Sequence, residues 1–164
     1  MADTLGKQAE HKIQQWLDTP ESGYCFDRIP DQLSGLWGSK NICDFTLYKY
    51  PYKYYIESKS TYADRFDFSM ISDYQLSNMY NKSKIIGVFS IIVVLFATHK
   101  RAFLLNIQDI KNLIDCGKKS LNIKKLDSWN IPNVEIPTVQ NNRKVLLDYS
   151  GDFQELVCKL LKNS

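Results

Sequence analysis

Cysteine and histidine are scarce in this sequence, which holds four of the first and two of the second among its 164 residues. The cysteines, Cys25, Cys43, Cys116 and Cys158, form no CxxC pair and show no zinc-ligand spacing. These absences exclude a zinc-finger domain and a small disulfide-stapled scaffold. We expect reduced thiols, as in a cytoplasmic protein.

Long apolar runs are absent as well. The most hydrophobic stretch, Ile85 to Thr98, includes Gly87 and Ser90 and falls short of the roughly 20 residues that a membrane-spanning helix needs. The polar N-terminus, MADTLGKQAEHK, has no signal-peptide core. We therefore expect neither membrane insertion nor export, and we interpret residues 85–98 as a long buried strand.

Charge of one sign is not in large excess, because the formal net charge is only +3. This balance permits nucleic-acid binding without requiring it. The 44% of hydrophobic residues is enough to bury the core of one domain. We interpret residues 1–164 as a single domain.

Apolar periodicity predicts an alternation of helices and strands. The near-continuous apolar character of residues 85–98 requires layers on both faces of a sheet, which favours an α/β sandwich. We expect helices over 4–18, 70–80 (capped by Ser69), 107–116 and 153–161, strands over 24–29, 85–98, 102–107, 118–125 and 145–149, and loops over 30–41, 60–67 and 129–142.

The most informative stretch begins at Cys43. Two β-rich runs, Cys43–Lys49 and Tyr54–Lys59, flank a turn that contains Pro51, which predicts a β-hairpin. If the loop has an even number of residues, opposed residues share a face. One face then carries Asp44, Thr46, Tyr48, Tyr55, Glu57 and Lys59, and the other carries Cys43, Phe45, Leu47, Tyr54 and Ile56, with Ser58 as the polar exception.

Two carboxylates and one ammonium on the first face indicate phosphodiester chemistry. Neighbouring carboxylates suit a hard cation such as Mg²⁺. A bound cation offsets charge on a phosphoryl oxygen, and a nearby ammonium stabilises charge that develops in the transition state. A solvated hairpin face with an ordinary mixture of Glu and Lys is the alternative reading of this short pattern.

Gln75 lies among apolar neighbours in the helix expected over residues 70–80. A buried glutamine needs hydrogen-bond partners. Orienting a water molecule or a phosphate oxygen would supply them. A plain glutamine at a helix boundary is the alternative.

The order of Asp44, the Glu57-Ser58-Lys59 strand and Gln75 resembles the PD-(D/E)XK nuclease pattern. The segment CDFTLYKYPYKYYIESKST and the later DYQLSNMY are similar to RecU-like Holliday junction resolvases, especially the short type of phages and prophages. The resemblance runs from about residue 5 to residue 104. It implies a restriction-endonuclease-like α/β fold with a central mixed β-sheet flanked by helices.

The resemblance also implies a metal-dependent endonuclease that uses Mg²⁺, with Mn²⁺ as a substitute. Asp44, Glu57 and the backbone carbonyl of Ser58 would hold the metal ion. Lys59 would position water or stabilise the transition state. Gln75 would orient water or phosphate, and cleavage would leave 5′-phosphate ends.

Other residues are implied at the edges of this site. Glu10, in the first helix, matches a carboxylate that PD-(D/E)XK enzymes often bring to the metal; a solvated helix glutamate is the alternative. Trp37 is a candidate for stacking on a base, and packing against its own domain is the alternative. The expected contacts to DNA are Ser39, Lys40, Thr61, Arg65, Lys100 and Arg101.

RecU-like enzymes act as homodimers that make paired cuts in four-way junctions, because a symmetric pair of sites faces symmetric strands. Longer members carry an insertion that forms a stalk before the catalytic hairpin. Here residues 30–42 alone join the first strand to the hairpin, so a full stalk does not fit. Two alternatives therefore stay open: a structure-tolerant DNA endonuclease of the same fold, and a non-catalytic DNA-binding accessory protein of recombination.

Overall fold

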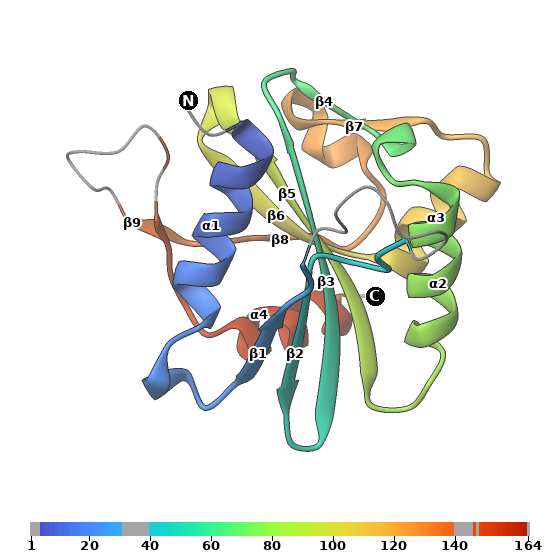
Figure 1. The fold of residues 1–164 in the computed structure, drawn as a ribbon. Coiled ribbons are helices and arrows are strands. Elements are labelled where there is room, and N and C mark those ends of the chain that lie inside the picture. Colours follow the sequence, from blue (N-terminus) through green and yellow to red (C-terminus); the bar gives the residue numbers. More distant parts are fainter. Residues whose placement is uncertain (1–3, 31–39, 140–145, 147, 164) are drawn as a thin grey trace.

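The computed structural model describes residues 4–30, 40–139, 146 and 148–163 (Figure 1). Within these residues, six strands form a central sheet in the order β1-β2-β3-β5-β6-β8. β3 and β5 run parallel, and the other neighbours are antiparallel. The strands are β1 (Cys25–Arg28), β2 (Phe45–Lys49), β3 (Tyr52–Thr61), β5 (Val88–Phe96), β6 (Arg101–Asn106) and β8 (Val134–Glu135).

Helices cover both faces of this sheet. Helices α1 (Leu5–Leu17) and α4 (Phe153–Lys162) share one apolar cluster with the sheet. Helices α2 (Asp73–Ser83) and α3 (Ile107–Asp115) share the other. The predicted fold class, α/β with a central mixed sheet flanked by helices, is confirmed. No helix among the described residues is long and apolar enough to cross a membrane.

The β5 sequence, VFSIIVVLF, explains why it occupies the middle of the sheet. Ile91 and Val93 pack in the cluster of α1 and α4, while Ile92 and Val94 pack in the cluster of α2 and α3. A strand with apolar side chains on both faces is stable only where both faces are covered. The expected strand over residues 85–98 is shorter in the structure, because residues before Val88 form a turn.

Two small sheets flank the main one. β4 (Arg65–Asp67) pairs with β7 (Ser120–Asn122), and β9 (Thr138–Val139) pairs with β10 (Asp148–Tyr149). The expected loops over 60–67 and 129–142 are therefore wrong in part, since they contain β4, β8 and β9. Short 3-10 helices complete the described chain at Pro20–Ser22, Phe68–Met70, Ala97–His99 and Ile123–Ser128, the last replacing the end of the strand expected over 118–125.

The predicted β-hairpin forms with a tighter turn than expected. Lys49 pairs with Tyr52, so two residues, Tyr50 and Pro51, make the turn. The even loop preserves the predicted faces, because Thr46 lies opposite Tyr55. β3 also extends beyond Lys59, since its last residues continue to pair with β5.

One face assignment in the hairpin is wrong. Cys43 is buried in the cluster of α2 and α3, whereas Phe45 and Leu47 are buried in the cluster of α1 and α4. β2 begins at Phe45, so the alternation of a strand does not extend back to Cys43.

The start of α2 is also corrected. The helix begins at Asp73, and its N-cap is Ser72 rather than Ser69. The Ser72 hydroxyl accepts the backbone N–H of Gln75, and the Gln75 side chain accepts the backbone N–H of Ser72. This capping box selects the start of the helix because it satisfies two donors that a helix end leaves open.

Candidate active site

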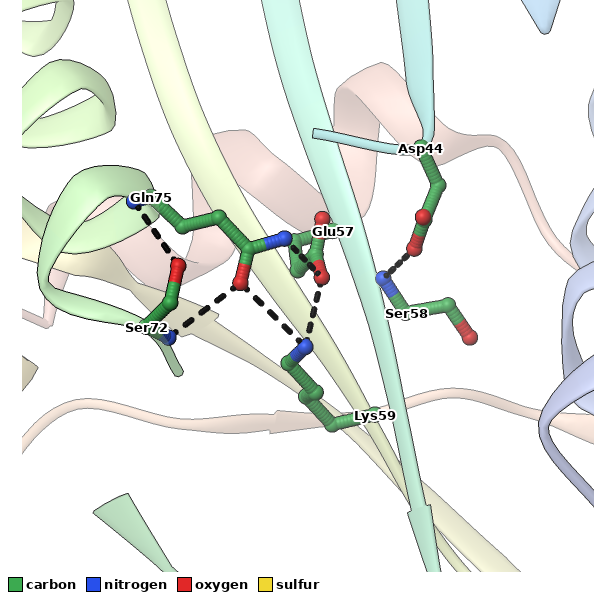
Figure 2. Close-up of polar contacts among 6 residues, drawn as sticks. All are labelled: Asp44, Glu57, Ser58, Lys59, Ser72 and Gln75. Carbon is green, nitrogen blue, oxygen red and sulfur yellow. Dashed lines mark hydrogen bonds and ion pairs between the residues drawn. The ribbon is translucent and has the colours of Figure 1, made fainter. Parts of the chain in front are cut away.

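The site is centred on Glu57 in β3. Its side chain is 2% exposed and faces α2, whose first turn carries Gln75 (Figure 2). Oε1 of Glu57 accepts hydrogen bonds from Nζ of Lys59 at 2.6 Å and from Nε2 of Gln75 at 2.7 Å. Glu57 and Lys59 meet because residues two apart in a strand point to the same face. The structure thus brings together three of the residues predicted for the site.

Asp44 reaches the same strand from the other side. Its Oδ2 accepts the backbone N–H of Ser58 at 2.8 Å, at the point where the chain enters β2 (Figure 2). In an extended strand the N–H and C=O of one residue point to the same edge. The carbonyl of Ser58 therefore lies on the same edge of β3 as the Asp44 carboxylate.

The two carboxyl groups are difficult to ionise where they lie. Burial, and then repulsion from Glu57, raise the pKa of Asp44 to about 7. Burial also raises the pKa of Glu57, although Lys59 and Gln75 act in the opposite direction. Buried carboxyls that repel each other gain from a bound cation, which favours both charged forms.

The donor set fits a hard divalent cation. No group of three or more Asp, Glu, His or Cys side chains that could hold a metal ion is found among the described residues. Mg²⁺ needs fewer, because it keeps several waters and binds through one or two carboxylates. Oε2 of Glu57 is buried and has no hydrogen-bond partner in the described part of the chain. Such an atom is costly unless a donor or a cation reaches it, so the residues present fit Mg²⁺.

Glu10 lies near this centre but is held by another residue. Its negative charge contributes to the raised pKa values of Asp44 and Glu57. Its Oε2 accepts Nη2 of Arg28, in β1, at 2.7 Å. Sequence reasoning missed Arg28, because the contact between α1 and β1 that brings Arg28 to Glu10 depends on the tertiary fold.

The predicted DNA contacts are dispersed. Ser39 and Trp37 lie outside the described residues. Lys40, Arg65 and Lys100 are exposed, whereas Thr61 is half-buried at the end of β3. Arg65 pairs with Asp67 at 3.0 Å, and Arg101 makes two hydrogen bonds to the carboxylate of Glu135, at 2.6 and 2.7 Å.

A mixed sheet with a buried Glu, a Lys two residues later and a helical Gln is the arrangement expected of a PD-(D/E)XK-type protein. A sequence model of RecU, described as Recombination protein U, matches residues 34–155. The chain therefore belongs to the RecU family.

Two further comparisons accompany this match. No curated protein sequence matches the chain. Among solved structures, it is similar to Hjc of Archaeoglobus fulgidus, a Holliday junction resolvase from an archaeal hyperthermophile, with 15% sequence identity and a TM-score of 0.46. The likeness covers 63% of this chain and 78% of the archaeal one.

Proposed function

We propose that the protein is a metal-dependent DNA endonuclease that resolves four-way (Holliday) junctions by paired symmetric cuts. Membership of the RecU family supports this function. The observation that carries it is the state of Glu57: Lys59 and Gln75 bind one carboxylate oxygen, and the other oxygen is buried without a partner in the described chain.

In this proposal Asp44, Glu57 and the Ser58 carbonyl hold Mg²⁺, with Mn²⁺ as a substitute and Glu10 as a nearby carboxylate. When bound, the cation would offset charge on a phosphoryl oxygen and lower the pKa of a water molecule. The carboxylates would hold the cation in a buried site, where electrostatic interactions are stronger than in water.

Lys59 and Gln75 act directly on the substrate. Lys59 has three N–H donors, and its contacts to Glu57 and Gln75 leave one for a phosphate oxygen. Gln75 donates one of its two amide hydrogens to Glu57, so the second is available to orient water or phosphate. The Lys59 ammonium places a positive charge, and the Gln75 amide places an N–H donor, where negative charge grows during cleavage.

We further propose that the enzyme acts in the cytoplasm as a homodimer, since paired cuts on a two-fold symmetric junction need two symmetric sites. The phosphate backbone would be contacted by Ser39, Lys40, Thr61, Arg65, Lys100 and Arg101. Each contact to phosphate adds salt dependence to binding.

A second candidate is a structure-tolerant endonuclease. The chain leaves β1 at Arg28 and enters β2 at Phe45, and these residues are paired in the sheet. The intervening segment is too short to carry a full stalk, which is the feature linked to junction selectivity in longer relatives.

Cleavage of a labelled four-way junction in Mg²⁺, beside a linear duplex of the same sequence, separates these functions. Paired symmetric nicks in the junction alone support the resolvase. Equal rates on both substrates would assign a general endonuclease. Binding that persists in EDTA, with no cleavage of either substrate in Mg²⁺ or Mn²⁺, would assign a non-catalytic accessory protein.

A further inference from the structure

We propose that Ser72 is a positioning residue that sets the orientation of the Gln75 amide against Glu57. The inference rests on the proposed nuclease function, because it concerns how the metal-binding carboxylate is prepared. Ser72 is the N-cap of α2 and is itself exposed.

Ser72 holds Gln75 through two separate contacts. Its hydroxyl accepts the backbone N–H of Gln75 at 3.2 Å, which fixes the start of the helix. Its own backbone N–H donates to Oε1 of Gln75 at 3.3 Å, which fixes the side-chain amide (Figure 2). The first contact fixes the backbone position of Gln75, and the second orients its side-chain amide.

The second contact leaves one orientation for the amide. Oε1 of Gln75 also accepts Nζ of Lys59, at 3.4 Å. A flipped amide would turn its NH₂ group toward two donors, Ser72 N–H and Lys59 Nζ, and would lose both hydrogen bonds. Nε2 is therefore directed at Oε1 of Glu57, 2.7 Å away.

This orientation makes the two oxygens of Glu57 unequal. Oε1 receives two donors, whereas Oε2 has none among the described residues. The proposal therefore assigns Oε2 as the oxygen that binds the cation. Ser72 contacts Gln75 and acts on the proposed metal site only through that residue.

Other helix caps provide a matched control. Asn106 caps α3, and its side chain accepts the backbone N–H of Gln108 at 3.1 Å. The Gln108 side chain bonds to Ser83 instead of a residue of the site. Asn106→Ala therefore removes a side-chain N-cap from a neighbouring helix and leaves the Gln75 amide in place.

Three substitutions at residue 72 separate the two contacts. Ser72→Thr keeps the hydroxyl and the N–H, and Ser72→Ala keeps the N–H alone. Ser72→Pro removes both the backbone N–H that donates to Gln75 and the hydroxyl that accepts from it. The proline ring matches the native φ of −66°. Ile71 already has the extended conformation that a residue before proline requires. The difference between the Pro and Ala variants thus reports the N–H that orients the amide.

The first readout needs no activity. In the metal-free protein, the ¹H–¹⁵N NMR signals of the Gln75 side-chain amide, identified by their loss in Gln75→Glu, should be unchanged in Ser72→Thr and Asn106→Ala. They should shift strongly in Ser72→Pro. Unchanged Gln75 amide signals in a folded Ser72→Pro variant would overturn the proposal, whether or not the protein is a nuclease.

The second readout is the metal site itself. Mn²⁺ affinity and single-turnover cleavage of the junction should each fall by about 10-fold or more in Ser72→Pro, the size typical of groups that orient a metal ligand. Ser72→Thr should retain both, and Asn106→Ala should lose thermal stability alone. Equal losses in Asn106→Ala and Ser72→Pro would reduce Ser72 to a helix cap. A wild-type protein that neither binds Mn²⁺ nor cleaves DNA would refute the proposed function, while the NMR result would still decide the role of Ser72.

Discussion

The carboxylate of Asp44 accepts the backbone N–H of Ser58, with 2.8 Å between Oδ2 and N. Behind this contact, the backbone N–H of Asp44 donates to the carbonyl of Ile56 at 3.2 Å. The backbone thus holds Asp44 beside the residue that follows Glu57. Asp44 is thereby held close enough to Glu57 for the two negative charges to repel, which contributes to the raised pKa of Asp44.

The first prediction concerns stability without metal. Burial and Glu57 raise the pKa of Asp44 to about 7, above the ~3.9 of an unfolded chain. A raised carboxyl pKa gives stability that is present at low pH and is lost as the pH rises through the folded-state value. In EDTA, the melting temperature should fall by about 3 °C or more between about pH 5 and pH 8.

Asp44→Asn should make this decline smaller, because the amide cannot ionise; Glu57, whose pKa burial also raises, contributes the remainder. Asp127→Asn, at an exposed position, is the matched control and should decline like the wild type. Parallel curves for the wild type and Asp44→Asn, measured by thermal unfolding across this pH range, would show that Asp44 does not carry the effect.

The second prediction concerns Lys59 as the partner of a buried charge. Lys59→Met leaves Glu57, which is 2% exposed, without its counter-charge. Removal of one member of a buried ion pair costs about 3 kcal/mol or more of unfolding free energy. Urea unfolding of Lys59→Met in EDTA near neutral pH should show this loss, and cleavage should be abolished.

The double variant Glu57→Gln/Lys59→Met should recover most of that stability, since neither residue is then a lone buried charge. It should remain inactive. If the effects of Glu57→Gln and Lys59→Met on the free energy of unfolding simply add in the double variant, the contact between Lys59 and Glu57 carries no coupling energy. The charge-pair explanation is then wrong.

The third prediction distinguishes two neighbouring cations at the turn between β5 and β6. Arg101 is committed to Glu135 through two hydrogen bonds, whereas Lys100 is exposed beside it. Lys100→Ala should reduce the slope of log binding constant against log salt by about 1, the effect of one lost phosphate contact. Arg101→Ala should weaken the β6–β8 pairing and change this slope less. The reverse ranking in DNA-binding titrations would assign the phosphate contact to Arg101.

The period of a strand made much of the site predictable from the sequence. Glu57 and Lys59 share a face because they are two residues apart, and an even loop keeps Thr46 opposite Tyr55. Cys43 broke the pattern because β2 begins after it. Alternation predicts faces only within a paired strand.

The sequence holds a signal for the start of α2. Ser69 and Ser72 both precede the apolar helix positions, but only Ser72 has a glutamine three residues later, which completes a capping box. The glutamine that completes this capping box also donates to Glu57, so one side chain belongs both to the helix cap and to the candidate site.

Long-range ion pairs were beyond prediction from the sequence. Arg28 binds Glu10, and Lys12, which is largely buried in α1, pairs with Asp148 in β10. Both pairs join segments that meet only after the sheet and its helices have formed. Propensity and periodicity describe local structure and contain no term for such contacts.

The central claim is that the carboxylate of Glu57 serves a metal-dependent cleavage centre. The direct test is single-turnover cleavage of a four-way junction in Mg²⁺ by the wild type, Glu57→Gln and, as a matched surface control, Glu155→Gln on α4. Glu57→Gln should remain folded and bind the junction, yet cut it more than about 100-fold more slowly. A loss of this size exceeds the usual effect of a residue that only orients a metal ligand. Glu155→Gln should cut like the wild type. Cleavage by Glu57→Gln at the wild-type rate would contradict the account.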